Sequence, residues 1–161
     1  MRRESPWEVG ECDMTFKEVE LTEAIAKQLM SLSEDWERED ICRGYRSNEL
    51  RDLDGNRIFL ALEGDAAVGY LLGHREIAEK ATSVYPAGAE YFEVEELYIK
   101  PEFRNRGIGK RLFHYVEAEA AAEADMIVLS TSTKNFRAVL HFYIDELGME
   151  FWSARLFKRI R

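Results

Sequence analysis

The residues best suited to chemistry in this sequence lie where an expected strand passes into an expected helix. Arg104, Gly107 and Gly109 follow an apolar strand pattern and precede a helical pattern rich in alanine and glutamate. A glycine turn that enters a helix leaves backbone N–H groups free, and the helix dipole adds partial positive charge to them. Glycine also lets a ligand approach the backbone closely. The turn therefore predicts a phosphate or pyrophosphate site.

A local excess of positive charge surrounds this turn. Lys100, Arg104, Arg106, Lys110 and Arg111 stand close together in a chain whose net charge is −9. The sequence contains neither G-x-x-x-x-G-K-[ST] nor G-x-G-x-x-G, so a P-loop and a dinucleotide fingerprint are both excluded. Two glycines at a helix start can also serve only to make a tight turn, so the surroundings must decide.

Those surroundings carry a resemblance to a known family. Arg104-x-x-Gly107-x-Gly109 resembles the Arg/Gln-x-x-Gly-x-Gly/Ala signature of the GNAT superfamily of N-acetyltransferases. The lead-in Glu-Leu-Tyr-Ile-Lys-Pro-Glu-Phe-Arg is similar to that family's strand and turn, and Asn135, Phe142-Tyr143 and Leu147-Gly148-Met149 fit downstream. The element order resembles the family's over roughly residues 14–160, although the specific motifs lie within 93–149.

The resemblance implies direct transfer of an acetyl group from acetyl-CoA to a primary amine in a ternary complex. The strand backbone would bind the pantetheine arm, the turn would bind the pyrophosphate, and an asparagine after the next strand would contact the cofactor. The residues that would bind the cofactor are Leu97, Tyr98, Ile99, Arg104, Asn105, Arg106, Gly107, Ile108, Gly109, Lys110 and Asn135.

The catalytic residues implied by the resemblance are a base, Glu95, and an acid, Tyr143. An amine must be neutral to attack a thioester, and a positioned base or acid is typically worth about 10² to 10⁴ in rate. A backbone N–H near Leu97 would stabilise the oxyanion. Glu93 and Glu96 are rivals for the base, and strict strand alternation puts Glu93, Glu95, Leu97 and Ile99 on one face and Glu96 on the other.

The spacing around Tyr143 departs from the family's pattern. The interval from Asn135 to Tyr143 and the interval from Tyr143 to Gly148 are each one residue longer than is usual. Phe142, which cannot donate a proton, is the other occupant of the tyrosine position. One residue turns a helix by about 100°, so Tyr143 keeps its role only if a bulge compensates. A non-catalytic acyl-CoA-binding module is therefore an alternative.

The elements that must position these residues can be read from the hydrophobic pattern. We expect strands over 14–19, 57–63, 66–74, 91–99 and 126–130, and a last strand over 151–160 that buries Trp152. We expect a helix after Thr22, one or two short helices within 33–55, and longer helices over 107–124 and 135–147.

The order strand–helix–strand from 91 to 130 implies that these two strands are parallel. The element order predicts a mixed α/β sheet with helices on both faces, and the resemblance implies a single domain of the GNAT type. Residues 1–11 form a polar N-terminal arm and 12–161 the domain.

Composition limits the remaining possibilities. A charged fraction of 33% and an apolar fraction of 46% are typical of a globular protein, and no apolar run approaches the roughly 20 residues of a membrane span. Cys12 and Cys42, and the three histidines, lack metal-ligand spacing, which indicates reduced thiols in a cytoplasmic protein without a metal. The negative charge disfavours nucleic acid as a partner.

The acceptor is open at this stage. The negative net charge is compatible with a small cationic amine as acceptor. The alternative is that this charge only keeps the protein soluble. A protein lysine or N-terminal amine is the alternative within the class. Trp36 stands in an acidic stretch, where it either lines the acceptor pocket or packs half-buried on a helix. The resemblance also favours a homodimer.

Overall fold

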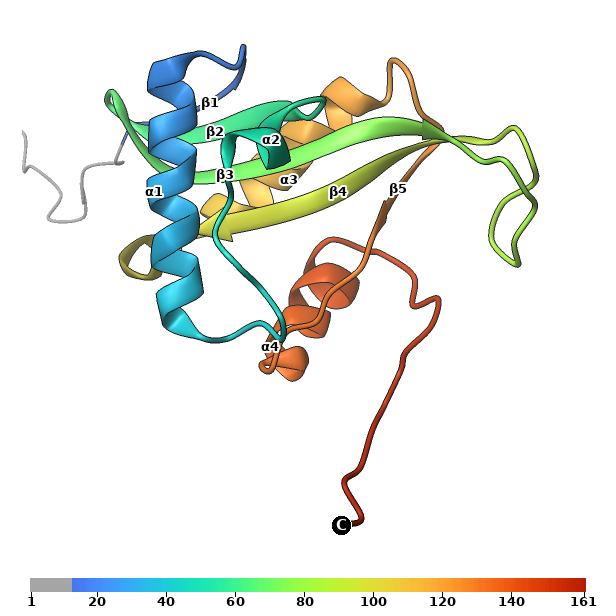
Figure 1. Cartoon of the computed structure of the whole chain (residues 1–161). Coiled ribbons are helices and arrows are strands. Elements are labelled where there is room, and N and C mark those ends of the chain that lie inside the picture. Colours follow the sequence, from blue (N-terminus) through green and yellow to red (C-terminus); the bar gives the residue numbers. More distant parts are fainter. Residues whose placement is uncertain (1–12) are drawn as a thin grey trace, which may run out of the picture.

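The fold is built on a five-stranded sheet in the order β1-β2-β3-β4-β5 (Figure 1). The strands of this computed structural model, which describes residues 13–161, are β1 (Met14–Val19), β2 (Arg57–Glu63), β3 (Ala66–Ile77), β4 (Glu90–Ile99) and β5 (Met126–Leu129). Neighbours from β1 to β4 are antiparallel, whereas β4 and β5 are parallel. The predicted mixed α/β sheet is confirmed; the predicted arm over 1–11 lies outside the described residues.

Helices cover both faces of this sheet. They are α1 (Glu23–Glu39), α2 (Leu50–Leu53), the 3-10 turn η1 (Pro101–Phe103), α3 (Ile108–Ala120), α4 (Phe136–Leu140) and the π-helix η2 (His141–Glu146). Helix α3 packs Leu112, Phe113 and Val116 against one face of the sheet. Helices α1 and α2 pack Leu29 and Leu53 against the other.

Helix α1 is longer than the sequence suggested. It begins where the Oγ1 atom of Thr22 accepts a hydrogen bond from the N–H of Ile25 (3.2 Å). It then continues through the acidic stretch, where we expected short separate helices. The reason is one uninterrupted apolar stripe, because Ala26, Leu29 and Leu32 are buried at helical spacing and half-buried Trp36 extends the same side.

A β-bulge interrupts the ladder between β3 and β4 at Glu95. Leu72 pairs with Glu96 and the next residue, Gly73, pairs with Val94, so Glu95 is the extra residue of β4. Leu97 and Ile99 therefore pack on the α3 side together with Val94 and Phe92, while Tyr98 packs on the α1 side. The strict alternation that placed Leu97 and Ile99 with the glutamates was wrong.

Strand β4 keeps its β5 neighbour for only half its length. The parallel ladder runs from Tyr91 opposite Met126 to Val94 opposite Leu129. Beyond that point β4 continues to Ile99, still paired with β3 on its other side. Within residues 13–161 no strand pairs with the β5-facing edge of β4 after Val94.

The expected last strand over 151–160 is wrong. Residues 150–161 lie outside the sheet and are exposed, and Trp152, expected in the core, has 44% of its surface exposed. The physical reason is a missing neighbour: this segment contacts the described part of the body through side chains, from Trp152 to Ser83 and Tyr85 and from Phe157 to Arg43, without a backbone ladder.

Gly73 tests whether the bulge depends on close approach of β3 and β4. A Cβ atom at Gly73 would lie 2.5 Å from the carbonyl oxygen of Glu93 and 2.5 Å from Cε1 of Phe92. We expect Gly73→Ala to lower the free energy of unfolding by about 1–3 kcal/mol, the usual range for overpacking, as measured by urea denaturation.

Gly55→Ala is the matched control for that measurement. Gly55 has φ +79° and nothing within 4 Å of the added methyl group, so the substitution introduces backbone strain alone, about 1 kcal/mol. Unchanged stability in Gly73→Ala would show that Gly73 is not sterically required.

Candidate active site

The turn at which we predicted an anion site has a row of backbone donors without a partner among the described residues, at the start of α3. Asn105 and Gly107 both have positive φ (60° and 73°), and the first helical hydrogen bond runs from the N–H of Arg111 to the carbonyl of Gly107 (3.0 Å). No hydrogen bond within residues 13–161 uses the N–H groups of 105–110. Nothing crowds a Cβ at Gly107, so its backbone conformation is what calls for glycine.

The cations around this turn have different tasks. Arg106 and Lys110 are exposed beside the free donors. The guanidinium of Arg104 instead donates two 2.8 Å hydrogen bonds to the Glu39 carboxylate, and its Nε donates to the carbonyl of Ile99 (2.8 Å). Arg104 thus ties the end of β4 to the end of α1 and shapes the turn, while the other two supply unpaired charge.

The turn continues into the open edge of β4. Leu97, Tyr98 and Ile99, the predicted pantetheine contacts, belong to the half of β4 that β5 has left. Leu97 and Ile99 pack toward α3, and the ring of Tyr98 packs toward α1. Their backbone groups on the β5-facing edge are therefore available to a ligand that lies along the strand.

The π-helix resolves the altered spacing around Tyr143. The N–H of Leu147 donates to the carbonyl of Phe142 five residues earlier (3.1 Å), and that of Met149 donates to the carbonyl of Tyr143 (2.9 Å). A π turn holds one more residue than an α turn, and such turns are frequent at functional sites. The helix therefore has a wide turn at Tyr143, the kind of irregularity that the altered spacing called for.

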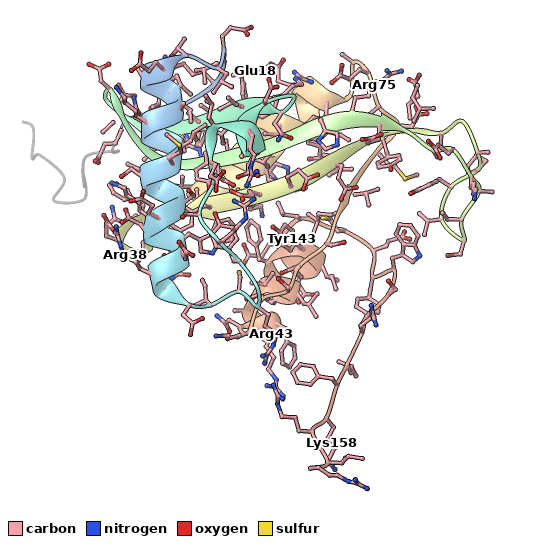
Figure 2. The ribbon with its side chains drawn as sticks, in the orientation of Figure 1. Glu18, Arg38, Arg43, Arg75, Tyr143 and Lys158 are labelled. Atoms are coloured by element: carbon pink, nitrogen blue, oxygen red, sulfur yellow. The ribbon has the colours of Figure 1, made fainter. Side chains whose placement is uncertain are left out.

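Tyr143 and Phe142 lie in different surroundings. The Tyr143 ring meets Phe113 edge-on, with centroids 6.2 Å apart (its place below the sheet is labelled in Figure 2). Phe142 lies against the start of α3, where a Cβ at Gly109 would be 3.5 Å from Cζ of Phe142. Burial, with a smaller contribution from nearby Cys42, raises the pKa of Tyr143 to about 12, so its hydroxyl holds a proton at neutral pH.

The bulge gathers three carboxylates on the α1–α2 side of β4. Glu93 lies opposite His74 in the ladder. Glu95 keeps about half of its side chain exposed (49%), with Oε1 3.8 Å from Nδ1 of His74. Burial and the neighbouring charge of Glu95 raise the pKa of Glu93 to about 7, against a smaller opposing effect of His74.

Glu96 is more deeply buried and is held by neutral donors. Its Oε2 accepts hydrogen bonds from the hydroxyl of Tyr70 (2.6 Å), the amide of Asn48 (2.9 Å) and the hydroxyl of Tyr45 (3.4 Å). Burial raises the pKa of Glu96, and these three donors act in the opposite direction because they stabilise the charged form.

Aromatic rings stand beside these carboxylates. Trp36 is half-buried between Tyr45, with ring centroids 4.4 Å apart, and Tyr98, at 5.3 Å. The hydroxyl of Tyr98 donates to Glu39 (3.0 Å). Aromatic faces near carboxylates suit a cationic ligand. Both interpretations of Trp36 are thus compatible: it packs on α1, and it lies on the side where the carboxylates gather.

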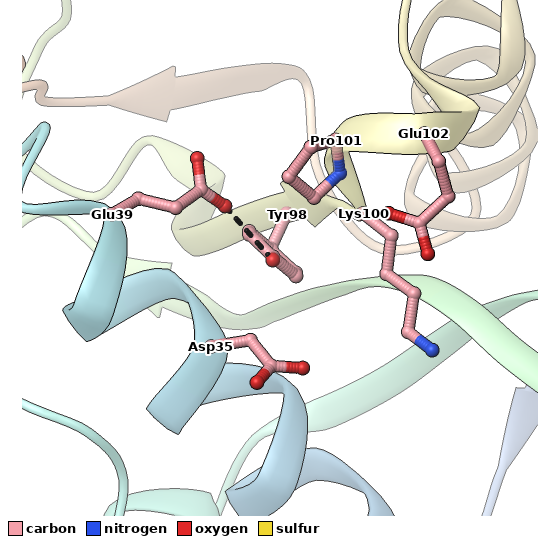
Figure 3. A pocket seen from close by; sticks show the side chains of 6 residues that line it. All are labelled: Asp35, Glu39, Tyr98, Lys100, Pro101 and Glu102. Carbon is pink, nitrogen blue, oxygen red and sulfur yellow. Dashed lines mark hydrogen bonds between the residues drawn. The ribbon is translucent and has the colours of Figure 1, made fainter.

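A small cavity lies nearby, between α1 and the end of β4. It has a volume of about 200 Å³ and is lined by Asp35, Glu39, Tyr98, Lys100, Pro101 and Glu102 (Figure 3). Ligand pockets typically measure about 300–1,000 Å³. The cavity is therefore too small to hold a bulky acceptor by itself.

Two loops are joined across the parted end of the sheet. The N–H of Arg43 donates to the carbonyl of Ser132 (3.0 Å), and the N–H of Lys134 donates to the carbonyl of Ile41 (2.7 Å). Cys42 and Thr133 form an isolated β-bridge between them. This pairing fixes the chain that leads to Asn135, the exposed N-cap residue of α4.

Among residues 13–161 no group of three or more histidine, cysteine or acidic side chains could hold a metal ion. No helix in the same part of the chain is long and apolar enough to cross a membrane.

Comparison with known proteins decides the family. Residues 22–149 match the Acetyltransferase (GNAT) family. The chain belongs to the GNAT acetyltransferase family. No curated protein matches the sequence closely enough to count as a relative.

Solved structures share this GNAT fold at low identity. An aminoglycoside acetyltransferase from an uncultured soil metagenomic sample superposes with a TM-score of 0.67 at 18% identity, covering 92% of this chain and 99% of its own. A ribosomal-protein-alanine N-acetyltransferase from Brucella melitensis biovar Abortus 2308 gives 0.63 at 16%, covering 91% and 99%. AAC(6')-Iy with a CoA bisubstrate analogue gives 0.61 at 18%, covering 92% and 98%.

Sequence reasoning missed several residues of this GNAT site. Tyr70, Asn48 and Tyr45, which hold Glu96, come from β3 and from the connection between α1 and α2. Tyr70 lies within an apolar strand pattern and gave no signal. The unusual spacing after Asn135 was the one clue to the π-helix, and it was visible in the sequence.

Proposed function

We propose that this GNAT protein transfers an acetyl group from acetyl-CoA to a primary amine of a small cationic molecule. One observation carries the proposal: the free N–H row at 105–110 leads directly into the unpaired edge of β4. A ligand with a pyrophosphate at one end and an amide-bearing arm at the other matches this succession of donors. Acetyl-CoA has that form.

The donor would use the residues predicted from sequence. The pyrophosphate would accept from the N–H groups of 105–110, with Arg106 and Lys110 adding charge. The pantetheine arm would pair with the backbone of Leu97 to Ile99, as a strand does. Asn135 would contact the cofactor from the opposite side of the opening.

The acceptor would approach from the carboxylate side of β4. Glu93, Glu95 and Glu96 present negative charge there, with Trp36 and Tyr45 alongside. A field of this sign concentrates cationic amines. The similar fold of an aminoglycoside acetyltransferase is consistent with such an acceptor, and that of a ribosomal-protein-alanine N-acetyltransferase keeps a protein amine as the alternative.

The chemistry follows from these placements. A carboxylate removes a proton from the ammonium, directly or through water, and the neutral nitrogen attacks the thioester carbonyl carbon. The oxyanion is stabilised by a backbone N–H near Leu97. The C–S bond then breaks, and Tyr143 protonates the departing thiolate. The acetylated nitrogen gives up its second proton to water, which leaves a neutral amide, and Tyr143 takes a proton back from solvent.

Among the three glutamates, Glu93 is the strongest candidate for the base. A base works best when its pKa lies near the working pH. The pKa of Glu93 is raised to about 7. Glu95, the residue favoured from sequence, is half exposed, and Glu96 already accepts three hydrogen bonds on one oxygen. We assign proton removal to Glu93 and give Glu96 the task of holding Tyr45 and Tyr70.

Calorimetric titration with acetyl-CoA tests the donor site. We expect saturable binding to the wild type and loss of binding in Gly107→Trp, because the indole would cover the N–H row. Gly64→Trp is the matched control, since Gly64 also has positive φ (59°) and open space but lies in the turn between β2 and β3. No binding to folded wild type would sink the acetyl-CoA proposal.

The pH dependence of kcat/KM tests the base. Because Glu93 must be ionised, we expect the rate to rise with pH through about 7 and then level off. Glu93→Gln should reduce the rate by about 10²-fold or more and abolish this rise of kcat/KM with pH.

Glu95→Gln serves as the control for the base. The charge of Glu95 raises the pKa of Glu93, so this variant should shift the rise of kcat/KM to lower pH. It should keep most of the activity. An unchanged rise of kcat/KM with pH in Glu93→Gln would assign the base elsewhere.

Replacement of Tyr143 separates an enzyme from a binding module. Tyr143→Phe should lower kcat by about 10²-fold, the lower end for general acid catalysis, while the Kd for acetyl-CoA changes little. Phe142→Leu is the control because Phe142 has no proton to donate. Full turnover in Tyr143→Phe would contradict its role as the acid.

A further inference from the structure

His74 lies beside the carboxylates of the candidate site, and the reaction proposed above does not use it. It belongs to β3 and lies opposite Glu93 in the ladder, so the two side chains share one face of the sheet. Its Nδ1 atom lies 3.8 Å from Oε1 of Glu95, and 29% of its side chain is exposed. His74 can therefore act on the ionisation of both glutamates.

Two partners hold the imidazole ring of His74 in place. Its Nδ1 lies 3.0 Å from Oδ1 of Asn56, and its Nε2 lies 3.0 Å from Oε1 of Glu76. The amide of Asn56 is itself oriented, because its Nδ2 donates to the carbonyl of Asp52 (3.0 Å). The reverse orientation would bring the amide oxygen against that carbonyl oxygen. The oxygen of Asn56 is thus the atom that faces Nδ1.

This arrangement favours the doubly protonated ring. A neutral imidazole has one donor nitrogen and one acceptor nitrogen, whereas the imidazolium has two donors. An amide oxygen and an ionised carboxylate are both acceptors, so only the imidazolium can donate to both partners at once. Asn56 and Glu76 therefore stabilise a positive charge on His74.

Glu93 lies among charges of both signs on this face of the sheet. Glu95 on its own strand and Glu76 on β3 disfavour its ionised form, whereas His74 favours it. Glu96, three residues farther along β4, is held by its own three donors. The neighbour of Glu93 in β5 is an uncharged valine. The ionisation of Glu93 therefore depends on the balance between these carboxylates and the imidazole.

The other cations of this region are engaged elsewhere. Arg46, from the connection between α1 and α2, donates two 2.9 Å hydrogen bonds to the carboxylate of Asp52. Arg57 and Arg75 lie on the α3 side of the sheet, where both donate to Glu123. Within the part of the chain that the structure describes, the imidazole is thus the cation placed to balance the carboxylates.

We propose that Asn56 and Glu76 hold His74 as an imidazolium, and that this charge keeps Glu93 ionised for the removal of a proton from the acceptor amine. His74 is then a positioning residue, because it acts through Glu93 and does not touch the reacting atoms. The inference rests on the proposed function only in giving Glu93 the role of the base.

A carbon-13 NMR titration of the glutamate carboxyl groups tests this charge coupling in the free protein, without turnover. The signal of Glu93 is assigned by its loss in Glu93→Gln. We expect His74→Gln to move the ionisation of Glu93 to higher pH, so that its ionised fraction at about pH 6 falls about threefold or more. His74→Lys keeps a positive charge and should titrate at the wild-type pH or below it.

His114→Gln is the matched control for this titration. His114 also has a carboxylate partner, since its Nδ1 lies 2.9 Å from Oε2 of Glu117, but it belongs to α3 on the other face of the sheet. Glu93 should therefore titrate in this variant as it does in the wild type.

The pH dependence of kcat/KM shows whether the coupling serves the reaction. In His74→Gln, kcat/KM at about pH 6 should fall about threefold or more, while the plateau above the ionisation of Glu93 changes by less than about twofold. His74→Lys should restore the rate at the lower pH. A role in folding alone would lower the rate by the same factor at every pH.

Two results would overturn the proposal. One is an unchanged titration of Glu93 in His74→Gln. The other is a loss of rate in His74→Gln that is equal at every pH and is not restored in His74→Lys. A folded wild type without acetyl transfer would contradict the proposed function instead, and the carboxyl titration would still decide whether His74 acts on Glu93.

Discussion

Strand β4 is the element on which the site depends, because its two edges have different neighbours along its length. β3 pairs with nearly all of it, whereas β5 leaves after Val94. A backbone edge that is held rigidly from one side and open on the other can bind an extended ligand without rearranging, which lowers the entropic cost of binding. The salt bridge of Arg104 with Glu39 and the bond from its Nε to Ile99 fix the end of this edge. The donor turn at 105–110 is thereby held in line with the strand.

The bulge at Glu95 has an electrostatic consequence as well as a geometric one. Regular alternation would divide the glutamates between two faces, but one inserted residue brings Glu93 and Glu96 to the same side. Buried carboxylates of like charge resist joint ionisation. Burial raises the pKa of both groups, but three donors oppose the rise at Glu96 and no hydrogen-bond donor among the described residues opposes it at Glu93, so their environments differ although they are three residues apart. Acid and base roles arise when different environments push the pKa values of neighbouring carboxyl groups apart.

Periodicity predicted the strands β1 to β5, the parallel pair and the helices on both faces, because these features depend on apolar residues at fixed intervals. The wrong predictions share a cause, because each concerns a feature that tertiary contacts determine. The bulge lies where Gly73 approaches Phe92 closely. The length of α1 depends on a stripe of apolar residues, which is hard to recognise among the charged residues of the same segment. Residues 150–161 have the alternating pattern of a strand. A strand forms only beside a neighbouring strand, and the pattern does not specify that neighbour. Within the candidate site, the glycine turn at 105–110 could be found from its sequence and spacing, whereas Tyr70, Asn48 and Tyr45 could be found only from their meeting at Glu96.

The π-helix lies where the spacing of the sequence departs from the family's pattern. An added residue in a regular helix rotates everything after it by about 100°. In η2, between Leu140 and Leu147, one of the two added residues is taken up within a wide turn. Tyr143 reaches Phe113 and the neighbourhood of Cys42, while Phe142 stays against Gly109 at the start of α3. Adjacent aromatic residues thus take separate positions, one with a hydroxyl that can give up a proton and one that closes the apolar side of the turn. The same wide turn sets the direction in which the chain leaves at Met149, whose N–H donates to the carbonyl of Tyr143, so the placement of Tyr143 and the course of residues 150–161 depend on one turn.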